Sequence, residues 1–401
     1  MKRWMILALV AATGVLLTAC DRGEPTSNPE TKAEGATAEQ PEELPPLNLE
    51  VKPQRLALGW GFSCYLNDAH ELWCWGWGEH FPVPGPKEAL PPTKQEIGVE
   101  LVSIAASHLT MCGLDQAGQV HCFGQPLYAN LKNPDDGAPL SSLSKANSVF
   151  LGGGSVCIVT LKGGIECLGA DSYNILGGDH FTRAPHIVPP PDGDRWVAGA
   201  GGQLHVCALS SLGSVWCWGD NNYGQLGIGT KSPSTQPALV SLGRRTLFLA
   251  ADGMTTCAVV EDGSVWCWGS GDLGALGQEA PEDCGESSCS LNPLQVSGVD
   301  SASQVSPGSF HGCSLNRSGT AECWGAGRKG QLGVGDKPKQ SPPRKLALTA
   351  KSILCENLRC CAELRDGGVV CWGDNGSRTA ANVDDKIVSM PTPIIFGGED
   401  E

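Results

Sequence analysis

Long amphipathic helices and an excess of basic charge are both missing from this 401-residue chain. No long stretch repeats its apolar residues with a helical period, whereas glycine (53) and proline (28) are abundant, so the pattern favours a large all-β body. Lys and Arg number 28 against 43 for Asp and Glu, which gives a net charge of -15. Because such a surface repels phosphate, general nucleic-acid binding is disfavoured.

Familiar catalytic motifs are also missing. The sequence has no G-x-S-x-G, no G-x-x-x-x-G-K-[ST], no H-E-x-x-H and no G-x-G-x-x-G in a βαβ setting. We therefore expect no catalytic residue, no metal site and no cofactor. An enzyme with an unfamiliar site stays open as a less favoured alternative.

The N-terminus has the parts of an export signal. Lys2 and Arg3 precede an apolar run, residues 4–17, that is too short for a comfortable transmembrane helix. The segment 17–20 (LTAC) resembles the lipobox of bacterial lipoproteins, which implies removal of residues 1–19 and lipidation of Cys20. The alternative is an ordinary secretion signal with a chance cysteine. Asp21 is a weak hint of retention at an inner membrane.

Residues 20–49 follow as an acidic, proline-rich segment with few large apolar side chains. Such a composition cannot bury enough surface to offset the entropy of ordering, so it predicts a flexible tether. Taken together, the N-terminal features predict a protein held on a bacterial membrane by its lipid, either periplasmic or surface-exposed.

Seven cysteine pairs, each separated by nine residues, mark an internal repeat. The pairs are Cys64 and Cys74, Cys112 and Cys122, Cys157 and Cys167, Cys207 and Cys217, Cys257 and Cys267, Cys313 and Cys323, and Cys361 and Cys371. Their first members lie 45 to 56 residues apart, the length of a four-stranded propeller blade.

Each pair brackets a predicted hairpin, as in CAVVEDGSVWC at 257–267. A turn midway between the cysteines places them opposite each other on neighbouring strands, close enough for a disulfide. Zinc is the competing interpretation, but C-x2-C pairs and clustered histidines are lacking. Four further cysteines remain, namely Cys284, Cys289, Cys355 and Cys360. We expect nine disulfides and no free thiol, with the pairing among Cys355, Cys360, Cys361 and Cys371 left open.

A second signature follows the second cysteine of each pair. It reads WGDNNYGQLGIGT at 218–230, WGSGDLGALG from 268 and WGAGRKGQLGVG from 324, and AGAGGQLHVCAL occupies 198–209. These segments resemble the regulator of chromosome condensation repeat. The resemblance covers roughly residues 50–398 and implies an all-β, seven-bladed propeller, while the added cysteines fit an exported branch of the family.

The two ends of the chain suggest how the ring closes. Residues 391–396 (PTPIIF) match the Pro-led strand of the fourth repeat at 237–242, and the body begins near residue 50. We expect residues 391–396 to pair with the segment 51–58, so that strands from both termini share one blade and no sheet edge is left exposed.

Recurring residues are interpreted first as structural. The tryptophans after the second cysteines are expected to pack between blades, and His205 and His311, each two residues before a first cysteine, are expected to be structural too. The candidate binding loops are those where repeats diverge, at Trp77, Tyr128, Asn222 and Tyr223.

These observations favour a monomeric, non-catalytic platform that binds an envelope or extracellular protein. The resembling family includes both a nucleotide-exchange branch and an exported propeller that inhibits a β-lactamase, so the resemblance is compatible with protein binding outside the cytoplasm. A glycan- or peptidoglycan-binding component of the cell wall is the alternative, with loop aromatics stacking on sugars.

Overall fold

A computed structural model describes residues 46–47, 52–124, 139–152, 154–169, 182–191, 193–381 and 385–397. The chain divides into Met1–Leu44 and Pro45–Glu401, and every described residue belongs to the second unit. Over these ranges we found no helix with the length and apolar character needed to cross a bilayer. The predicted signal peptide, Cys20 and Tyr128 lie outside the described residues.

The described part of the chain is all-β, with its strands in six hydrogen-bonded sheets. The first sheet contains β1 (Leu56–Gly59), β2 (Phe62–Leu66), β3 (Leu72–Trp77) and β4 (Ala89–Lys94). The second contains β5 (Leu101–Ser107), β6 (Thr110–Asp115) and β7 (Val120–Gly124). The third contains β8 (Ala146–Gly152), β9 (Ser155–Thr160), β10 (Ile165–Gly169) and β11 (Thr182–Val188).

The remaining sheets continue this order. The fourth contains β12 (Trp196–Gly201), β13 (His205–Ser210), β14 (Val215–Gly219) and β15 (Ser234–Leu239). The fifth contains β16 (Thr246–Asp252), β17 (Thr255–Val260), β18 (Val265–Ser270), β19 (Glu282–Asp283) and β20 (Ser288–Gln295). The sixth contains β21 (Ala302–Pro307), β22 (His311–Asn316), β23 (Thr320–Gly325), β24 (Ser341–Glu356), β25 (Arg359–Leu364), β26 (Val369–Asp374) and β27 (Ile387–Ile394). Two short 3-10 turns, η1 (Gly78–His80) and η2 (Asp272–Gly274), lie in loops.

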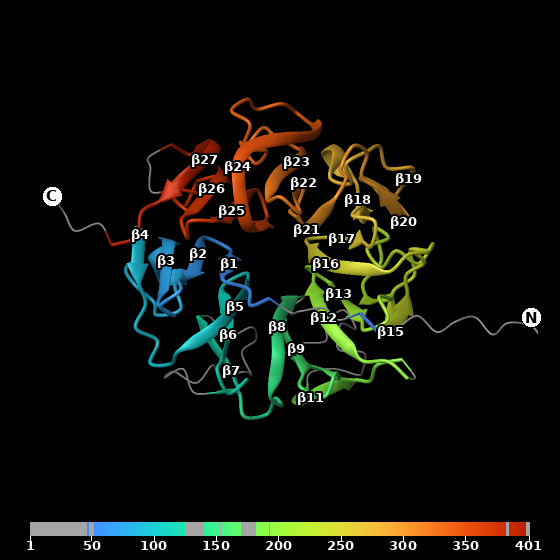
Figure 1. Cartoon of the computed structure of the whole chain (residues 1–401), viewed down its shortest axis with the longest axis horizontal. Helices are drawn as coiled ribbons and strands as arrows, with labels where there is room; N and C mark the ends of the chain where they lie inside the picture. Colours follow the sequence, from blue (N-terminus) through green and yellow to red (C-terminus); the bar gives the residue numbers. More distant parts are fainter. Residues whose placement is uncertain are drawn as a thin grey trace, which may run out of the picture. The chain divides into compact units, whose positions relative to one another are not determined.

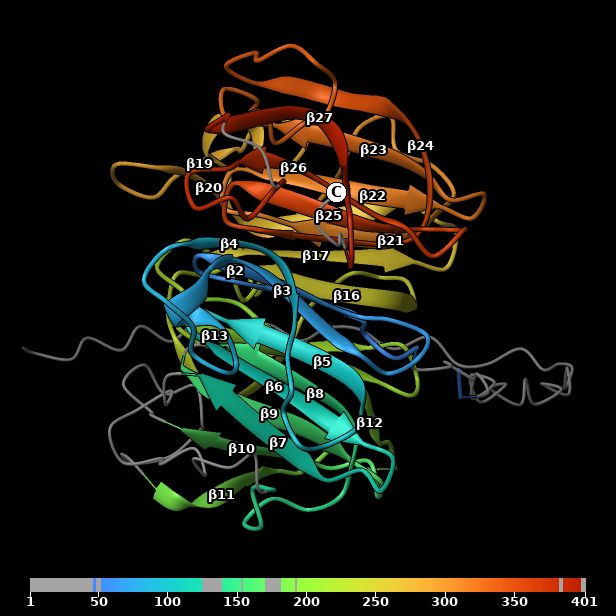
Figure 2. The same ribbon diagram turned by 90° about the vertical axis from the view of Figure 1, so that its left-hand side faces the viewer.

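The sheets follow one another in chain order around a common centre (Figure 1). The sixth sheet holds two repeats, because the 16-residue β24 pairs through its first half with β23 and through its second half with β25. Seen from the side, the strands run between two faces that carry the turns (Figure 2). The first strand of each repeat lies at the centre, so the turns after these strands gather on one face and the turns of the cysteine hairpins on the other.

Each cysteine hairpin has the register that its sequence predicts. Cys207 lies directly opposite Cys217, and Cys257 lies opposite Cys267. All seven pairs are disulfide-bonded with Cα atoms 4.1 Å apart. The pairing left open from the sequence is Cys355 with Cys360 and Cys361 with Cys371, and Cys284 bonds Cys289.

The tryptophans that follow the second cysteines pack between repeats, as expected. The indole Nε1 of Trp268 donates a 3.0 Å hydrogen bond to the carbonyl of Gln225 in the preceding repeat. That glutamine belongs to the G-Q-L-G segment, which explains why the two motifs recur together. Trp75, Trp218, Trp268, Trp324 and Trp372 are all fully buried.

The predicted closure by strands from both termini is wrong. β27 pairs with β26, and β1 pairs with β2, so residues 391–396 add no strand to the first sheet. The first sheet has its own outer strand, β4, with the sequence ALPPTK. The ends of the chain meet through side chains instead, since the ring of Phe396 lies 5.6 Å from that of Tyr65.

Candidate functional site

A central cavity of about 1320 Å³ lies within the described part of the chain. Its wall is built from the innermost strands β1, β5, β8, β12, β16, β21 and the second half of β24. Because every repeat contributes one of these strands, residues that are far apart in sequence line the same space. The two mouths of this cavity differ in chemistry and are described in turn.

The first mouth is formed by the turns that follow the innermost strands. We call it the rim and define it by Trp60, His108, Gln203, Ser309 and Asn357, all of which line the cavity. Neighbouring turns are tied together by backbone bonds, from Trp60 N to the His108 carbonyl (2.5 Å) and from Ser309 N to the Asn357 carbonyl (2.9 Å). The rim is therefore a hydrogen-bonded structure, although it consists of loops.

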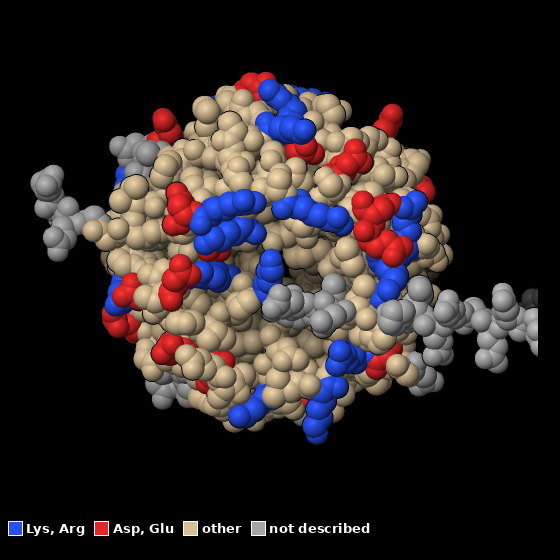
Figure 3. All heavy atoms as spheres, in the orientation of Figure 1, with Lys and Arg blue, Asp and Glu red and all other residues tan. Residues whose placement is uncertain are grey.

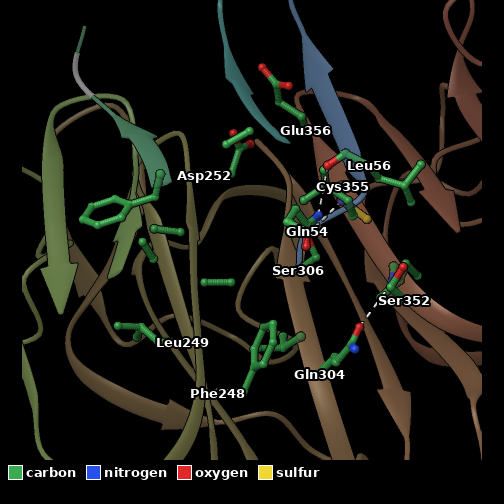
Figure 4. Close-up of a pocket in the computed structure, with 18 of the residues that line it drawn as sticks. Gln54, Leu56, Phe248, Leu249, Asp252, Gln304, Ser306, Ser352, Cys355 and Glu356 are labelled. Carbon is green, nitrogen blue, oxygen red and sulfur yellow. Dashed lines mark hydrogen bonds between the residues drawn. The ribbon is translucent and has the colours of Figure 1, made fainter. Parts of the chain in front are cut away.

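Two carboxylates lie at this end of the cavity. Figure 4 shows Asp252 and Glu356 at the same end, away from Phe248 and Gln304. Asp252 Oδ2 accepts a 3.2 Å hydrogen bond from the backbone N–H of Asn357, whereas Glu356 Oε2 has no partner among the described residues.

The cavity wall largely encloses both carboxylates, although each keeps some access to water. Burial raises the pKa of Asp252 to about 6, and hydrogen bonds from Asn357 and Gly253 oppose that rise. Burial also raises the pKa of Glu356 well above its ordinary value, with Arg359 opposing the shift. Both carboxyl groups are therefore poorly solvated, and a cationic partner group beside them would favour their ionised forms.

The opposite mouth carries basic side chains. Lys52, Arg55, Arg317, Lys351 and Arg365 line the cavity. Figure 3 shows basic side chains around a hollow near the centre of the face that it views. Glu363 neutralises part of this charge, since its Oε1 lies 3.4 Å from Arg55 Nη1 and 3.5 Å from Lys351 Nζ. The cavity is thus polarised along its length, within a chain whose overall charge is negative.

Trp60 is the most exposed aromatic residue that borders the cavity. Its side chain is 63% exposed, which is unusual for tryptophan in a hydrogen-bonded turn. Sequence reasoning missed it, because it stands alone and belongs to no repeated motif. A signal was available in GWG at 59–61, where a tryptophan occupies a tight turn between two apolar strands.

The structure places the predicted loop residues on the face that carries the rim. The Trp77 N–H bonds the carbonyl of Gly61, which brings its loop beside Trp60, and its indole donates to Glu79 at 3.0 Å. Asn222 is exposed and donates to Asp220, and Tyr223 is partly buried. Asn221 is the loop's structural residue, because its amide donates to two backbone carbonyls, those of Thr230 and Ser232.

The two histidines are fully buried and contact the next repeat, as their structural interpretation requires. His205 Nε2 lies 2.7 Å from Thr256 Oγ1, and His311 Nε2 lies 3.1 Å from Cys360 Sγ. Burial lowers the pKa of each imidazole to about 3, so both are neutral. His311, Cys355 and Cys360 form a close cluster in which the two sulfurs are bonded to each other.

Comparison with known proteins identifies the repeats. The model of the regulator of chromosome condensation (RCC1) repeat matches residues 213–258 and 262–315, and a second model of this repeat matches residues 196–225. No curated protein matches the chain by sequence.

Among solved structures, yeast RCC1 (Prp20), solved bound to Kap60, is 18% identical with a TM-score of 0.70, over 90% of this chain and 91% of that one. Prp20p from Saccharomyces cerevisiae is also 18% identical with a TM-score of 0.70, over 87% of each chain. Human WBSCR16 is 20% identical with a TM-score of 0.66, over 82% of this chain and 94% of that one. The fold is thus that of RCC1-like proteins, and the repeats within residues 196–315 belong to the regulator of chromosome condensation repeat family.

Proposed function

We propose that this chain is a lipid-anchored protein of the bacterial envelope, and that its repeats form a seven-bladed propeller that binds a protein partner at the rim. The observation that carries the proposal is Trp60, which projects 63% exposed from a hydrogen-bonded turn at the mouth of the cavity. A large, rigid aromatic side chain on a fixed backbone is the kind of residue that dominates binding energy at interfaces.

The proposal of seven blades is supported by counting innermost strands rather than sheets. β24 closes one repeat and opens the next, so the seven-stranded sixth sheet counts as two blades. Each of the seven resulting units has one cysteine hairpin and one strand along the cavity.

Two features favour a protein over a glycan as the partner. Trp60 and Phe310 are the large aromatic side chains that are exposed in the described ranges, so there is no row of rings on which several sugars could stack. The rim mixes this aromatic surface with Gln203, Ser309 and Asn357, a composition typical of protein interfaces. Among the structural neighbours, the yeast protein is described with protein partners, namely Kap60, Gsp1p and histones.

The carboxylates beneath the rim narrow the chemistry of the partner. Asp252 and Glu356 lie at the floor of this mouth, where a neighbouring cation would favour their charged forms, and Glu356 Oε2 has no hydrogen-bond partner among the described residues. We therefore expect the partner to insert a loop with a basic residue, beside apolar contact with Trp60.

Affinity capture from solubilised envelopes tests this proposal, with the full chain as bait in three versions. Trp60→Ala removes the exposed indole. Leu161→Ala is the matched control, because Leu161 is 58% exposed but lies in a hairpin turn on the opposite face. We expect one protein to be captured by the wild type and by Leu161→Ala, and its purified form to bind Trp60→Ala at least tenfold more weakly.

Equal affinity of the partner for all three baits would show that the rim is not the binding site. Isolated peptidoglycan serves as a second ligand in the same assay. If peptidoglycan binds and the Trp60→Ala bait loses it, the glycan alternative replaces the protein proposal.

A further inference from the structure

The disulfide between Cys355 and Cys360 differs from every cysteine hairpin. It joins the second half of β24 to β25, at a register where the fifth repeat has Ala251 opposite Thr256 and the sixth repeat has Pro307 opposite Gly312. β25 is also bonded to β26 through Cys361 and Cys371, so this strand carries one disulfide to each of its two neighbours.

One of its sulfurs has an unusual neighbour. Cys360 Sγ lies 3.1 Å from His311 Nε2, and both residues are fully buried. The equivalent contact in another repeat is between His205 and Thr256, at 2.7 Å. There the threonine hydroxyl already donates to the carbonyl of Gln225, so His205 must be the donor and its proton is on Nε2.

The same assignment holds for His311. A disulfide sulfur has no hydrogen to give, and His311 Nδ1 has no partner among the described residues. The neutral imidazole therefore directs its Nε2–H at Cys360 Sγ. A disulfide sulfur is a weak acceptor, whereas a thiolate is an anion, so this N–H stabilises Cys360 much more strongly after the disulfide has opened.

The other cysteine of this disulfide belongs to the cavity wall. Cys355 lines the central cavity and is 3% exposed, and Figure 4 shows it on the wall near Gln54, Leu56 and Ser306. A small thiol that enters the cavity thus approaches Cys355 first, while Cys360 lies behind it beside His311.

We propose that Cys355 and Cys360 form a thiol–disulfide exchange site for low-molecular-weight thiols. A thiolate from the cavity attacks Cys355 Sγ and forms a mixed disulfide, and the electron pair of the broken bond leaves on Cys360 Sγ, which His311 stabilises. A second thiolate attacks the thiol's sulfur in that mixed disulfide and releases Cys355. Two thiols are oxidised to one disulfide, and the protein disulfide gains two electrons and, from water, two protons.

Redox titration of the folded full chain tests the proposal. The chain is equilibrated in glutathione buffers of stepwise ratio, quenched with an alkylating reagent and mapped by peptide mass spectrometry. We expect Cys355 and Cys360 to become alkylated while the seven hairpin disulfides stay oxidised. The disulfide Cys284–Cys289, whose Cys284 is partly exposed, is the control that shows how much reduction solvent exposure alone produces. If Cys355–Cys360 remains oxidised until the hairpin disulfides are also reduced, the proposal is wrong.

The role of His311 is tested by His311→Leu, with His205→Leu as the matched control. Loss of one charge-assisted hydrogen bond should lower the equilibrium constant for reduction of Cys355–Cys360 about tenfold, which is about 30 mV for two electrons. His205→Leu should leave it unchanged, and His311→Gln, which keeps an N–H donor, should restore part of the loss. A shift of equal size in both leucine variants, or none in His311→Leu, would overturn the assignment. Should His311→Leu not fold, comparing His311→Gln with the wild type decides the same question.

Discussion

The indole Nε1 of Trp75 donates a 2.8 Å hydrogen bond to the carbonyl oxygen of Thr379, 304 residues further along the chain. The same bond joins neighbouring repeats elsewhere, from Trp268 to Gln225, from Trp324 to Ala275 and from Trp372 to Gln331. The first and last repeats therefore meet through the same contact that joins these three pairs of consecutive repeats.

This equivalence gives a stability prediction. Trp75→Phe removes the donor and leaves space in a fully buried site, so we expect the free energy of unfolding to fall by about 1–3 kcal/mol. Trp372→Phe, which breaks the same bond between two consecutive repeats, should cost a similar amount. Denaturant unfolding measures both. A normal stability for Trp75→Phe together with a clear loss for Trp372→Phe would show that the first and last repeats do not hold each other.

The repeat and its disulfides could be predicted from sequence because both are local. A turn midway between two cysteines fixes the register in which their strands pair. A tryptophan that recurs at one position of the repeat indicates the same packing role in every repeat that has it. The closure could not be predicted in this way. Pro91 and Pro92 lie in β4, an outer strand whose free edge tolerates proline, so the first sheet needs no strand from the C-terminal segment.

The candidate site was less accessible to sequence reasoning than the fold. Trp60, Asp252 and Glu356 come from three different repeats and meet only because the innermost strands share one cavity. Asp252 also precedes a glycine, and an Asp-Gly pair in a sequence indicates an ordinary turn. The loops that we had selected, at Trp77 and Asn222, do lie on the face of the rim, because a cysteine hairpin returns its second strand to that face.

Asp252 should make stability depend on pH. Its pKa of about 6 in the folded chain lies above the ordinary 3.8, so the folded state binds this proton more tightly than the unfolded chain. The stability from this group is fully present below about pH 4 and is lost as the pH rises through about 6. Asp252→Asn keeps an acceptor for the N–H of Asn357 but cannot ionise.

We therefore expect Asp252→Asn to stabilise the chain at pH 7.5 by about 1–2 kcal/mol and to be nearly neutral at pH 4. Thermal unfolding at the two pH values measures this. Asp366→Asn, in a hairpin turn with an exposed carboxylate, is the control and should change little at either pH. A destabilising effect of Asp252→Asn at pH 7.5 would contradict the raised pKa.

The disulfides should differ in how much each contributes to the free energy of unfolding. Replacing Cys257 and Cys267 with serine removes a crosslink of sequence separation 10 and buries two hydroxyls at fully buried positions, so we expect a loss of about 3 kcal/mol or more. Replacing Cys284, which is partly exposed, and Cys289, which is buried in β20, removes a crosslink of separation 5 and should cost about 2 kcal/mol or less. Chemical denaturation ranks the two variants, and equal losses would argue against burial as the cause of the difference.

Anchoring makes a separate prediction for Cys20. Cys20→Ala removes the atom that would carry the lipid, so the chain should leave the membrane fraction or keep its signal peptide. Fractionation and the mass of the purified chain measure these outcomes, and Cys20→Ala that is both processed and membrane-bound would require another anchor.

Hydrogen exchange in Arg359→Met tests the closed ring most directly. Arg359 lies on β25 near the end of the chain, and its guanidinium donates to the carbonyls of Gly59 and Phe62 in the first repeat. We expect the variant to raise amide exchange in residues 56–66 as well as around β25. Thr255→Val, at the equivalent position of the fifth repeat, should leave residues 56–66 unchanged. Unchanged protection of residues 56–66 in Arg359→Met would contradict a ring that is closed by side chains between the first and last repeats.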